Sequence, residues 1–392
     1  MIPVAFLLLI VWLAVLGLWL LEYHRLSVLR QSIPIRIGVT GTRGKSSLVR
    51  MLAGAFRANG MAVFAKTSGS RACMILPDGS EVAVHRNGLP SILEQKRILS
   101  LAAKSGCTVL VCEIMSIRPK YQEIESRRIL GLTHCVVTNC RIDHPEHGTS
   151  KDSVARCFST SVPVHGTVFC PEKELRPVLV RSAEALSSEL VAVDSSDLGK
   201  DSMSALEAGR FDHVELGENV ALARGVCEAF GLDDRLSFSG MMAATGDVGA
   251  LRAWDVDGVV CVSAFAANDI ESTRLLLDRL PAGRRIGLLN LRADRPERTR
   301  QYIDAVLKGV FKDVEMFFCV GAHARLFRRK VGSVCPVIPV PNKLEGSAIL
   351  AYIRRRIGCD GGAFQLVGMG NIAGKPKELI ACWEKHGVRH EF

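Results

Sequence analysis

The chain has 392 residues, a formal net charge of +10 and only 6% aromatic residues. The positive charge suits a partner such as an anionic lipid surface or a polyanionic ligand. Basic residues do not alternate with aromatic ones, which argues against nucleic acid as a partner. About 370 residues follow an apolar N-terminal segment, a length that suits two domains.

The first 21 residues contain no charged side chain. As a helix they would span about 31 Å, the thickness of a hydrocarbon core. No basic residue precedes this segment, and it runs on into Trp19, which argues against a cleaved signal peptide. Arg25 and Arg30 follow it, so the positive-inside rule places the later residues in the cytoplasm. We therefore expect residues 1–22 to form a single-pass anchor in the cell membrane, with the domains that follow it in the cytoplasm.

A glycine-rich stretch, Gly-Thr-Arg-Gly-Lys-Ser-Ser, directly follows the apolar strand expected at residues 35–40. A strand that leads through such a turn into a helix presents backbone N–H groups and a helix N-terminus to phosphates. Lys45 is placed to reach the β- and γ-phosphates, and Ser46 to contact Mg²⁺. The motif is shorter than the common P-loop, which has a glycine at the place of Val39. The stretch predicts ATP binding by Gly41, Thr42, Arg43, Gly44, Lys45, Ser46 and Ser47.

The next segments continue an α/β pattern. A helix after the glycine-rich turn should end at Asn59 and Gly60. A hairpin is expected from 73–76 into 81–85, through the turn Pro-Asp-Gly-Ser. Ser91 and Glu94 form the S-x-x-E pattern of a capping box, which predicts that the following helix starts at Ser91.

Acidic residues follow two of the expected strands. Glu113 comes directly after the strand at 108–112, and Asp143 and His144 follow the strand at 134–138. Because ligands bind at the carboxyl ends of parallel strands, Glu113 is a candidate ligand of the Mg²⁺ that Ser46 contacts. Histidine is an unusual Mg²⁺ ligand, so the residues alone leave His144 as a loop residue. The alternation over 33–243 predicts a parallel sheet with helices on its faces, with strands at 35–40, 61–66, 108–112, 134–138, 167–170 and 189–193.

A small, flexible stretch at 243–249 marks the expected boundary of a second α/β domain over 250–392. Helices are expected at 270–280, 297–309 and 344–356. Strands are expected at 258–263, 285–290, 315–320, 336–340 and 363–367.

Thirteen cysteines raise the question of a zinc site. Cys107, Cys112, Cys135 and Cys140 form two C-x₄-C pairs, whereas zinc sites favour C-x₂-C spacing. Several of these cysteines lie in strand-like apolar runs, so we expect buried thiols that pack as small apolar residues.

Together these motifs resemble a known family. The loop at 41–46, Glu113, Asn139 with Asp143 and His144, and the run 218–223 resemble the central ATP-binding domain of Mur ligases and folylpolyglutamate synthases. Residues 264–269 look like a variant of the motif that opens the third domain of those enzymes. Arg43, the runs 290–295 and 368–372, and the N-terminal anchor are more narrowly similar to the ligase subunits of poly-γ-glutamate synthases.

The resemblance implies an ATP-dependent acid–amino-acid ligase that polymerises glutamate through its γ-carboxyl group. An acyl phosphate would be the intermediate, and ADP and phosphate the other products. The implied fold is a Mur-ligase-like P-loop domain followed by a Rossmann-like α/β domain. The implied partners are glutamate, the growing polyglutamate chain and a multi-span membrane subunit of the synthase.

The resemblance also assigns residues to roles. Ser46 and Glu113 would hold one Mg²⁺, or Mn²⁺ in its place, and His144 would be a ligand of a second. The implied catalytic residues are Lys45, Glu113, His144, Arg292 and Arg295. Beyond the loop, the implied nucleotide-binding residues are Asn219, Arg252, Asn268 and Asp294.

The sequence departs from the family at two positions and leaves other functions open. Ser159 stands near the place of a modified lysine, and Ala264 stands where an acidic residue is expected. Arg292, Arg295 and Arg252 are either substrate ligands or members of ion pairs. The competing functions are another amide ligase of the Mur or folylpolyglutamate type, a membrane-tethered kinase or ATPase that drives export, and a non-catalytic nucleotide-binding scaffold.

Overall fold

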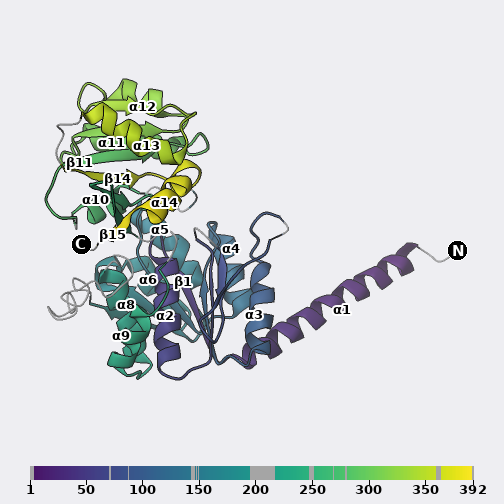
Figure 1. Ribbon diagram of the computed structural model, residues 1–392. Coiled ribbons are helices and arrows are strands. Elements are labelled where there is room, and N and C mark those ends of the chain that lie inside the picture. Colours follow the sequence, from purple (N-terminus) through teal and green to yellow (C-terminus); the bar gives the residue numbers. More distant parts are fainter. Residues whose placement is uncertain are drawn as a thin grey trace. The chain divides into compact units, whose positions relative to one another are not determined.

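The computed structural model describes residues 4–390 except 70–71, 87, 143–145, 147, 149, 195–216, 247–250, 268, 279 and 359–362. The described residues divide into two compact units, which we describe separately. The first unit contains the described residues up to Asp194 and those from Glu218 to Ala244, and the second contains Gly217 and the described residues from Thr245 onwards. In Figure 1 the first unit runs from purple to teal and the second from green to yellow.

The first unit is built on an eight-stranded sheet with the order β4-β3-β2-β5-β1-β6-β7-β8. The strands from β2 to β8 in this order are parallel, whereas β3 and β4 form an antiparallel hairpin at one edge. The bounds are β1 Ile35–Thr40, β2 Val63–Thr67, β3 Cys73–Ile75, β4 Glu81–Ala83, β5 Val109–Glu113, β6 His134–Val137, β7 Thr167–Pro171 and β8 Glu189–Val193. The expected strands are all present, with ends shifted by one or two residues.

The helices of this unit flank its sheet, except for the first, which extends away from it (Figure 1). They are α1 Val4–Gln31, α2 Lys45–Ala58, α3 Glu94–Lys104, α4 Pro119–Glu123 leading into a π-helical segment η1 Ile124–Leu130, α5 Lys151–Phe158, α6 Pro177–Ala185, α8 Gly217–Ala229 and α9 Asp234–Met242. The apolar stripe of α2 is buried, and the helix ends before Asn59 as expected. Helices α2 and α9 pack closely, since a Cβ on Gly240 would lie 2.3 Å from the Gly54 carbonyl oxygen.

The capping box expected at Ser91 is wrong. Helix α3 begins at Glu94, and Leu93 at its N-cap position makes no side-chain cap. The Glu94 carboxylate instead forms ion pairs with Lys66 at 2.6 Å and with Arg86 at 2.8 Å. Lys66 is fully buried on β2. A buried ammonium group needs a charged partner, and this requirement outweighs a local cap.

The second unit has a seven-stranded sheet with the order β13-β12-β11-β14-β10-β9-β15. Five strands are parallel, and β9 and β15 add an antiparallel edge. The strands are β9 Arg252–Val256, β10 Val259–Ser263, β11 Arg285–Asn290, β12 Met316–Val320, β13 Val337–Pro339, β14 Gln365–Met369 and β15 Val388–His390. The helices are α10 Ile270–Leu277, α11 Pro296–Leu307, α12 Ala324–Val331, α13 Gly346–Ile357 and α14 Lys375–His386.

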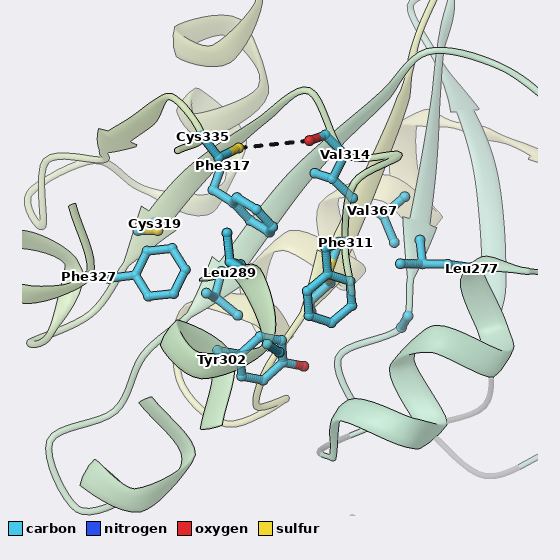
Figure 2. Close-up of a cluster of buried hydrophobic side chains, with 14 of the residues drawn as sticks. Leu277, Leu289, Tyr302, Phe311, Val314, Phe317, Cys319, Phe327, Cys335 and Val367 are labelled. Carbon is cyan, nitrogen blue, oxygen red and sulfur yellow. Dashed lines mark hydrogen bonds between the residues drawn. The ribbon is translucent and has the colours of Figure 1, made fainter. Parts of the chain in front are cut away.

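Two apolar clusters hold this second sheet to its helices. Figure 2 shows the one that contains the rings of Tyr302, Phe311, Phe317 and Phe327 around Leu289. The Tyr302 and Phe311 rings are stacked with centroids 5.8 Å apart, and the Phe317 and Phe327 rings meet edge to face at the same separation. This packing fixes the parallel strands, and with them the loops at the carboxyl ends.

Candidate active site

The glycine-rich loop between β1 and α2 adopts a conformation that only glycine fits. Gly41 and Gly44 have φ values of 128° and 82°. A Cβ on Gly41 would lie 2.0 Å from Thr138 Oγ1, and one on Gly44 would lie 2.4 Å from Asn219 Oδ1. The loop therefore lies directly against β6 and α8, and glycine is required by both φ and space.

Residues after β6 hold this loop in place. Asn139 Oδ1 accepts a hydrogen bond from Arg43 N at 3.1 Å, and Asn139 Nδ2 donates to Arg43 O at 3.0 Å. Thr42 N donates to Asn139 O, and Thr42 Oγ1 donates to Arg141 O at 2.7 Å. These four hydrogen bonds hold residues 42 and 43 of the loop against the chain that follows β6.

Lys45 and the first turn of α2 supply positive charge at the loop. Lys45 Nζ donates to Gly41 O at 2.7 Å and to Thr42 O at 3.2 Å, so the ammonium group spans the loop. Ser46 and Ser47 follow in the first turn of this 14-residue helix. An ammonium group beside a helix N-terminus is suited to a phosphate chain. ATP binding by residues 41–47 stays a prediction, and this geometry is compatible with it.

Ser46 and Glu113 meet at the carboxyl ends of β1 and β5. Ser46 Oγ donates to Glu113 Oε2 at 2.8 Å, and Ser68 N donates to the same oxygen at 2.7 Å. Glu113 is only 4% exposed. A hydroxyl and a carboxylate are the hard oxygen ligands that Mg²⁺ and Mn²⁺ prefer, so these residues fit a divalent cation. The predicted ligand His144 and its neighbour Asp143 lie outside the described residues.

A buried carboxylate, Glu125 of η1, supports the turn that follows Glu113. It accepts hydrogen bonds from Met115 N and Ser116 N, each at 3.0 Å, and from Gln95 Nε2 at 2.6 Å. The sequence gives no local sign of this role, because Glu125 lies among the basic residues of a helical segment. These three hydrogen bonds hold the backbone just beyond β5, next to Glu113.

Glu218 and Asn219 bring the start of α8 to the loop. Glu218 pairs with Arg141 and Lys173, each at 2.5 Å. Burial raises the pKa of Glu218, but Arg141 and Lys173 outweigh burial and hold the pKa below its usual value. The resulting network keeps Asn219 beside Gly44, where its amide faces the loop.

The cysteines near the site are buried and protonated. Burial raises the pKa of Cys112 and of Cys135 to about 12. Among the residues that the structure describes, no group of three or more His, Cys, Asp or Glu side chains is arranged to hold a metal. These thiols pack against the sheet as small apolar side chains.

The second unit has its own pocket of about 590 Å³ at the carboxyl ends of β11 and β12. Ligands of open α/β sheets bind at this edge. The pocket is lined by Asn290, Arg292, Ala293, Asp294, Val320, Gly321, Ala322, Val340, Pro341, Asn342, Ile349, Ala373, Gly374 and Lys375. Three residues named from the sequence, Asn290, Arg292 and Asp294, therefore lie together.

Polar contacts order this pocket. Arg292 binds both carboxylate oxygens of Asp294, at 2.7 and 2.6 Å. Asn290 Nδ2 donates to the carbonyl groups of Asn371 at 2.6 Å and Ala373 at 2.9 Å. Lys375, at the start of α14, adds a second cation that sequence reasoning missed. The available signal was the Gly-Lys-Pro run, typical of a helix start, after the strand at 363–367.

Other predicted residues of the second unit have different surroundings. Arg295 precedes α11, is exposed and is not among the lining residues of the pocket. Arg252 lies at the start of β9, with its guanidinium 3.8 Å from the carboxylate of Glu384. Asn268 lies outside the described residues. Asp269, in the 264–269 run, caps α10 by accepting a hydrogen bond from Ser272 N at 2.8 Å.

Comparisons with known proteins agree with this architecture. The model of the Mur ligase middle domain matches residues 39–166, and that of the poly-gamma-glutamate synthase CapB C-terminal domain matches residues 250–386. Among solved structures, the bifunctional folylpolyglutamate synthase/dihydrofolate synthase of Yersinia pestis, complexed with AMPPNP and Mn, has a TM-score of 0.69 at 16% identity and covers 92% of each chain. MurF of Acinetobacter baumannii has a TM-score of 0.65 at 13% identity, covering 93% of this chain and 79% of its own. These likenesses establish the fold.

Curated relatives extend over both units. The capsule biosynthesis protein CapB of Bacillus anthracis is 29% identical over 393 residues, covering 94% of this chain and 80% of the relative. The PGA synthase CapB of Bacillus subtilis is 29% identical over 314 residues, covering 77% of this chain and 78% of the relative. A match to the Mur ligase middle domain followed by a match to the CapB C-terminal domain, together with two CapB relatives that cover most of the chain, makes this chain similar to the CapB proteins of poly-γ-glutamate synthesis.

Proposed function

We propose that this chain is an ATP-dependent acid–amino-acid ligase that joins glutamate units through their γ-carboxyl groups. The observation that carries the proposal is the loop at 41–47, with Lys45 across it and Ser46 bonded to Glu113, in a chain whose curated relatives are CapB proteins. We assign residues 1–22 to the anchor, 33–243 to the ATP-binding domain and 250–392 to the C-terminal ligase domain.

The reaction needs an activated carboxylate. A carboxylate oxygen attacks the γ-phosphorus of ATP, the bond to the β-phosphate oxygen breaks, and an acyl phosphate and ADP form. The amine of the second substrate then attacks the acyl carbon, loses a proton and expels phosphate. In the first step the protein mainly orients groups and offsets charge. Lys45 and those N–H groups of the loop and of the first turn of α2 that Asn139 does not engage perform that task.

Ser46 and Glu113 are the residues that would hold a divalent cation, Mg²⁺ or Mn²⁺, which supplies positive charge beside the phosphates when bound. The resemblance adds His144 as a ligand of a second cation. Lys45, Asn219 and the backbone of residues 41–44 bind the nucleotide. The solved structure of the Yersinia pestis relative, complexed with AMPPNP and Mn, supports this assignment of ligand types.

The pocket of the second unit is the proposed site for the carboxylates of the glutamate substrate or of the polyglutamate end. Arg292 and Lys375 provide positive charge there. Because Nε and Nη2 of Arg292 are bonded to Asp294, a substrate carboxylate would bind the remaining guanidinium nitrogen or replace Asp294 in the bidentate pair. Asp294 holds Arg292 in place and is available to a substrate amine or hydroxyl group. Arg295, one residue beyond Asp294, and Arg252 remain proposed ligands outside the lining of this pocket.

Helix α1 is long and apolar enough to cross a membrane by its length and composition. We assign it as a single-pass anchor with the two domains on the cytoplasmic side. Such an anchor keeps a growing polyanion next to the membrane that it must cross. The proposed partner is therefore a multi-span membrane subunit that exports the polymer.

The test uses membranes that contain this chain with ATP and with glutamate labelled with ¹⁸O in its carboxylates. The acyl-phosphate route predicts ¹⁸O in the released phosphate, because the activated carboxylate oxygen leaves with phosphorus. Lys45→Ala should lower label transfer by about 10²–10³-fold. Lys104→Ala, an exposed lysine at the end of α3, is the matched control and should behave as the unmodified chain.

Each alternative function gives a different result. Rapid phosphate release without ¹⁸O would contradict the ligase and indicate an ATPase. A phosphorylated product without amide formation would indicate a kinase. Nucleotide binding without turnover would indicate a scaffold. Label transfer with a folate or a peptidoglycan precursor, but not with glutamate as the acceptor, would indicate another amide ligase of the same fold.

A further inference from the structure

The cytoplasmic end of α1 is fixed to the first unit by side-chain contacts. Glu22 forms an ion pair with Lys96 of α3. Arg30 Nε donates to Ile129 O at 3.1 Å, at the end of η1. Leu26 and Leu29 pack on the apolar cluster that contains Ile98 of α3. The direction in which α1 leaves this unit is therefore set by the fold.

The same contacts show that α1 and α3 run in the same direction. Glu22 lies beside Lys96, which is 74 residues later in the chain. Just after the C-terminal ends of the two helices, Ile35 N donates to Thr108 O at 3.2 Å. The number of residues between Ile35 and Thr108 is almost the same as between Glu22 and Lys96. The start of α3, one turn before Lys96, therefore lies on the side of the unit towards which α1 continues to Trp19, although α1 is inclined to α3 (Figure 1). Trp19 is in the last turn of the apolar segment, so the start of α3 reaches the level where α1 enters the membrane.

The residues at that level form an exposed surface, residues 88–93 together with Arg97, which we call the rim surface. Leu89 is 93% exposed and Leu93 is 57% exposed. Arg97 is exposed one helical turn after Leu93. Leu89, Arg97 and Ile98 line one hollow of about 150 Å³, so the rim surface continues into the cluster on which α1 packs.

The charge of the rim surface is positive. Its neighbouring carboxylate, Glu94, is engaged by Lys66 and Arg86, and these partners outweigh burial and lower its pKa. Glu22 is engaged by Lys96. Among the described residues, no ion pair involves Arg97. At a membrane surface, exposed leucines can enter the acyl-chain region while a neighbouring arginine without an ion pair binds anionic headgroups, so this set of side chains suits that boundary.

We propose that the rim surface contacts the bilayer next to α1, with Leu89 and Leu93 inserted at the acyl boundary and Arg97 beside anionic lipid headgroups. The inference rests on α1 crossing the membrane. Lipid is favoured over a protein as the occupant because the contacts between α1 and α3 place the rim surface on the membrane side of the unit. The contact would hold the first unit in one orientation on the membrane.

The test is photocrosslinking of the full chain, inserted in vesicles of phosphatidylcholine and phosphatidylglycerol, with p-benzoylphenylalanine at single positions. Probes at Leu89 and Leu93 should give lipid adducts, as should a probe at Leu9 within α1. A probe at Leu236 on α9, which is 50% exposed, is the matched control and should give none. With the probe at Leu89, Arg97→Gln should lower adduct yield about fivefold, whereas Arg235→Gln, another exposed arginine, should not.

Adducts at Leu9, Leu89 and Leu93 but not at Leu236 support the proposal. Adducts at Leu9 alone overturn it and leave the anchor intact. No adduct at Leu9 overturns the anchor and the inference together, and the ¹⁸O experiment then still tests the ligase. If Leu89 and Leu93 crosslink to another protein in native membranes and not to lipid, the rim surface is a protein interface and the proposal is wrong.

Discussion

At the scale of single residues, the metal-binding proposal depends on Ser46 and Glu113. Glu113→Gln keeps the size of the side chain and an oxygen for Ser46, but it removes the negative charge. We expect kcat to fall by about 10²–10³-fold and the Mg²⁺ requirement to rise. Glutamate-dependent phosphate release measured over a range of Mg²⁺ concentrations checks both effects. Glu189→Gln, an exposed site on β8, is the control, and wild-type behaviour of Glu113→Gln would remove Glu113 from the site.

His134 on β6 gives a prediction about pH. Burial lowers its pKa to about 4, and the charge of Arg36 adds to the effect. The imidazole lies against the Phe230 ring, with centroids 4.7 Å apart. The unfolded chain takes up a proton near pH 6.5, whereas the folded chain does so only near pH 4. The contribution of His134 to stability is therefore complete above pH 6.5 and is lost as the pH falls towards 4, by roughly 3 kcal/mol.

Urea unfolding of the detergent-solubilised chain at several pH values measures this effect. His134→Gln should flatten the fall in unfolding free energy between pH 6.5 and 4, whatever its stability at pH 7. The exposed His165, changed to Asn, should leave the slope unchanged. An unchanged slope in His134→Gln would mean that the histidine is not held neutral by the fold.

At the scale of elements, the loop between β1 and α2 lies against α8, and this contact restricts which residue can stand at position 44. Gly44 and Gly60 have nearly the same positive φ, 82° and 79°. Alanine at either costs about 1–2 kcal/mol in that conformation. Only at Gly44 does the added Cβ meet another residue, Asn219, whereas nothing lies within 4 Å at Gly60. Gly44→Ala should therefore weaken ATP binding at least tenfold, measured by calorimetry, and Gly60→Ala should not. Equal binding by both variants would show that the Asn219 contact is dispensable.

Elements with a local signature were predictable from the sequence, and elements made by distant contacts were not. The apolar run of β5 ends in an acidic residue, and this pattern predicted both the strand and the position of Glu113 at its end. The pairing of β15 with β9 joins residues such as Val388 and Asp255, and no local pattern encodes such a contact. Glu94 is part of a capping-box pattern in the sequence, but in the structure it forms an ion pair with Lys66. The sequence does not predict that Lys66 is buried. Lys375 was missed because only the fold brings α14 to the ends of β11 and β12.

At the scale of the whole molecule, the anchor and the phosphate loop are linked through one strand of the first unit. The docked end of α1 leads directly into β1, and the loop begins where β1 ends, about 20 Å further on. Helix α3 returns towards that same edge, since Gln95 Nε2 donates to Glu113 O at 3.4 Å. The rim surface at the start of α3 therefore lies at the edge of the sheet that carries Glu113, the proposed metal ligand. Synthesis next to the bilayer follows from this arrangement if the rim surface contacts lipid.

Two truncations separate anchoring from folding. A chain that starts at Glu22 loses the apolar segment but keeps Leu26, Leu29 and the bond from Arg30. We expect it in the aqueous fraction after sedimentation, with an unfolding free energy within about 1 kcal/mol of that of the full chain. A chain that starts at Ile33 also loses that packing, and we expect a further loss of about 3 kcal/mol. Urea unfolding of the first unit distinguishes them. Equal stability of the two truncated chains would mean that the C-terminal part of α1 does not stabilise the first unit by packing on it. The contacts of α1 would then not fix the direction in which α1 leaves this unit.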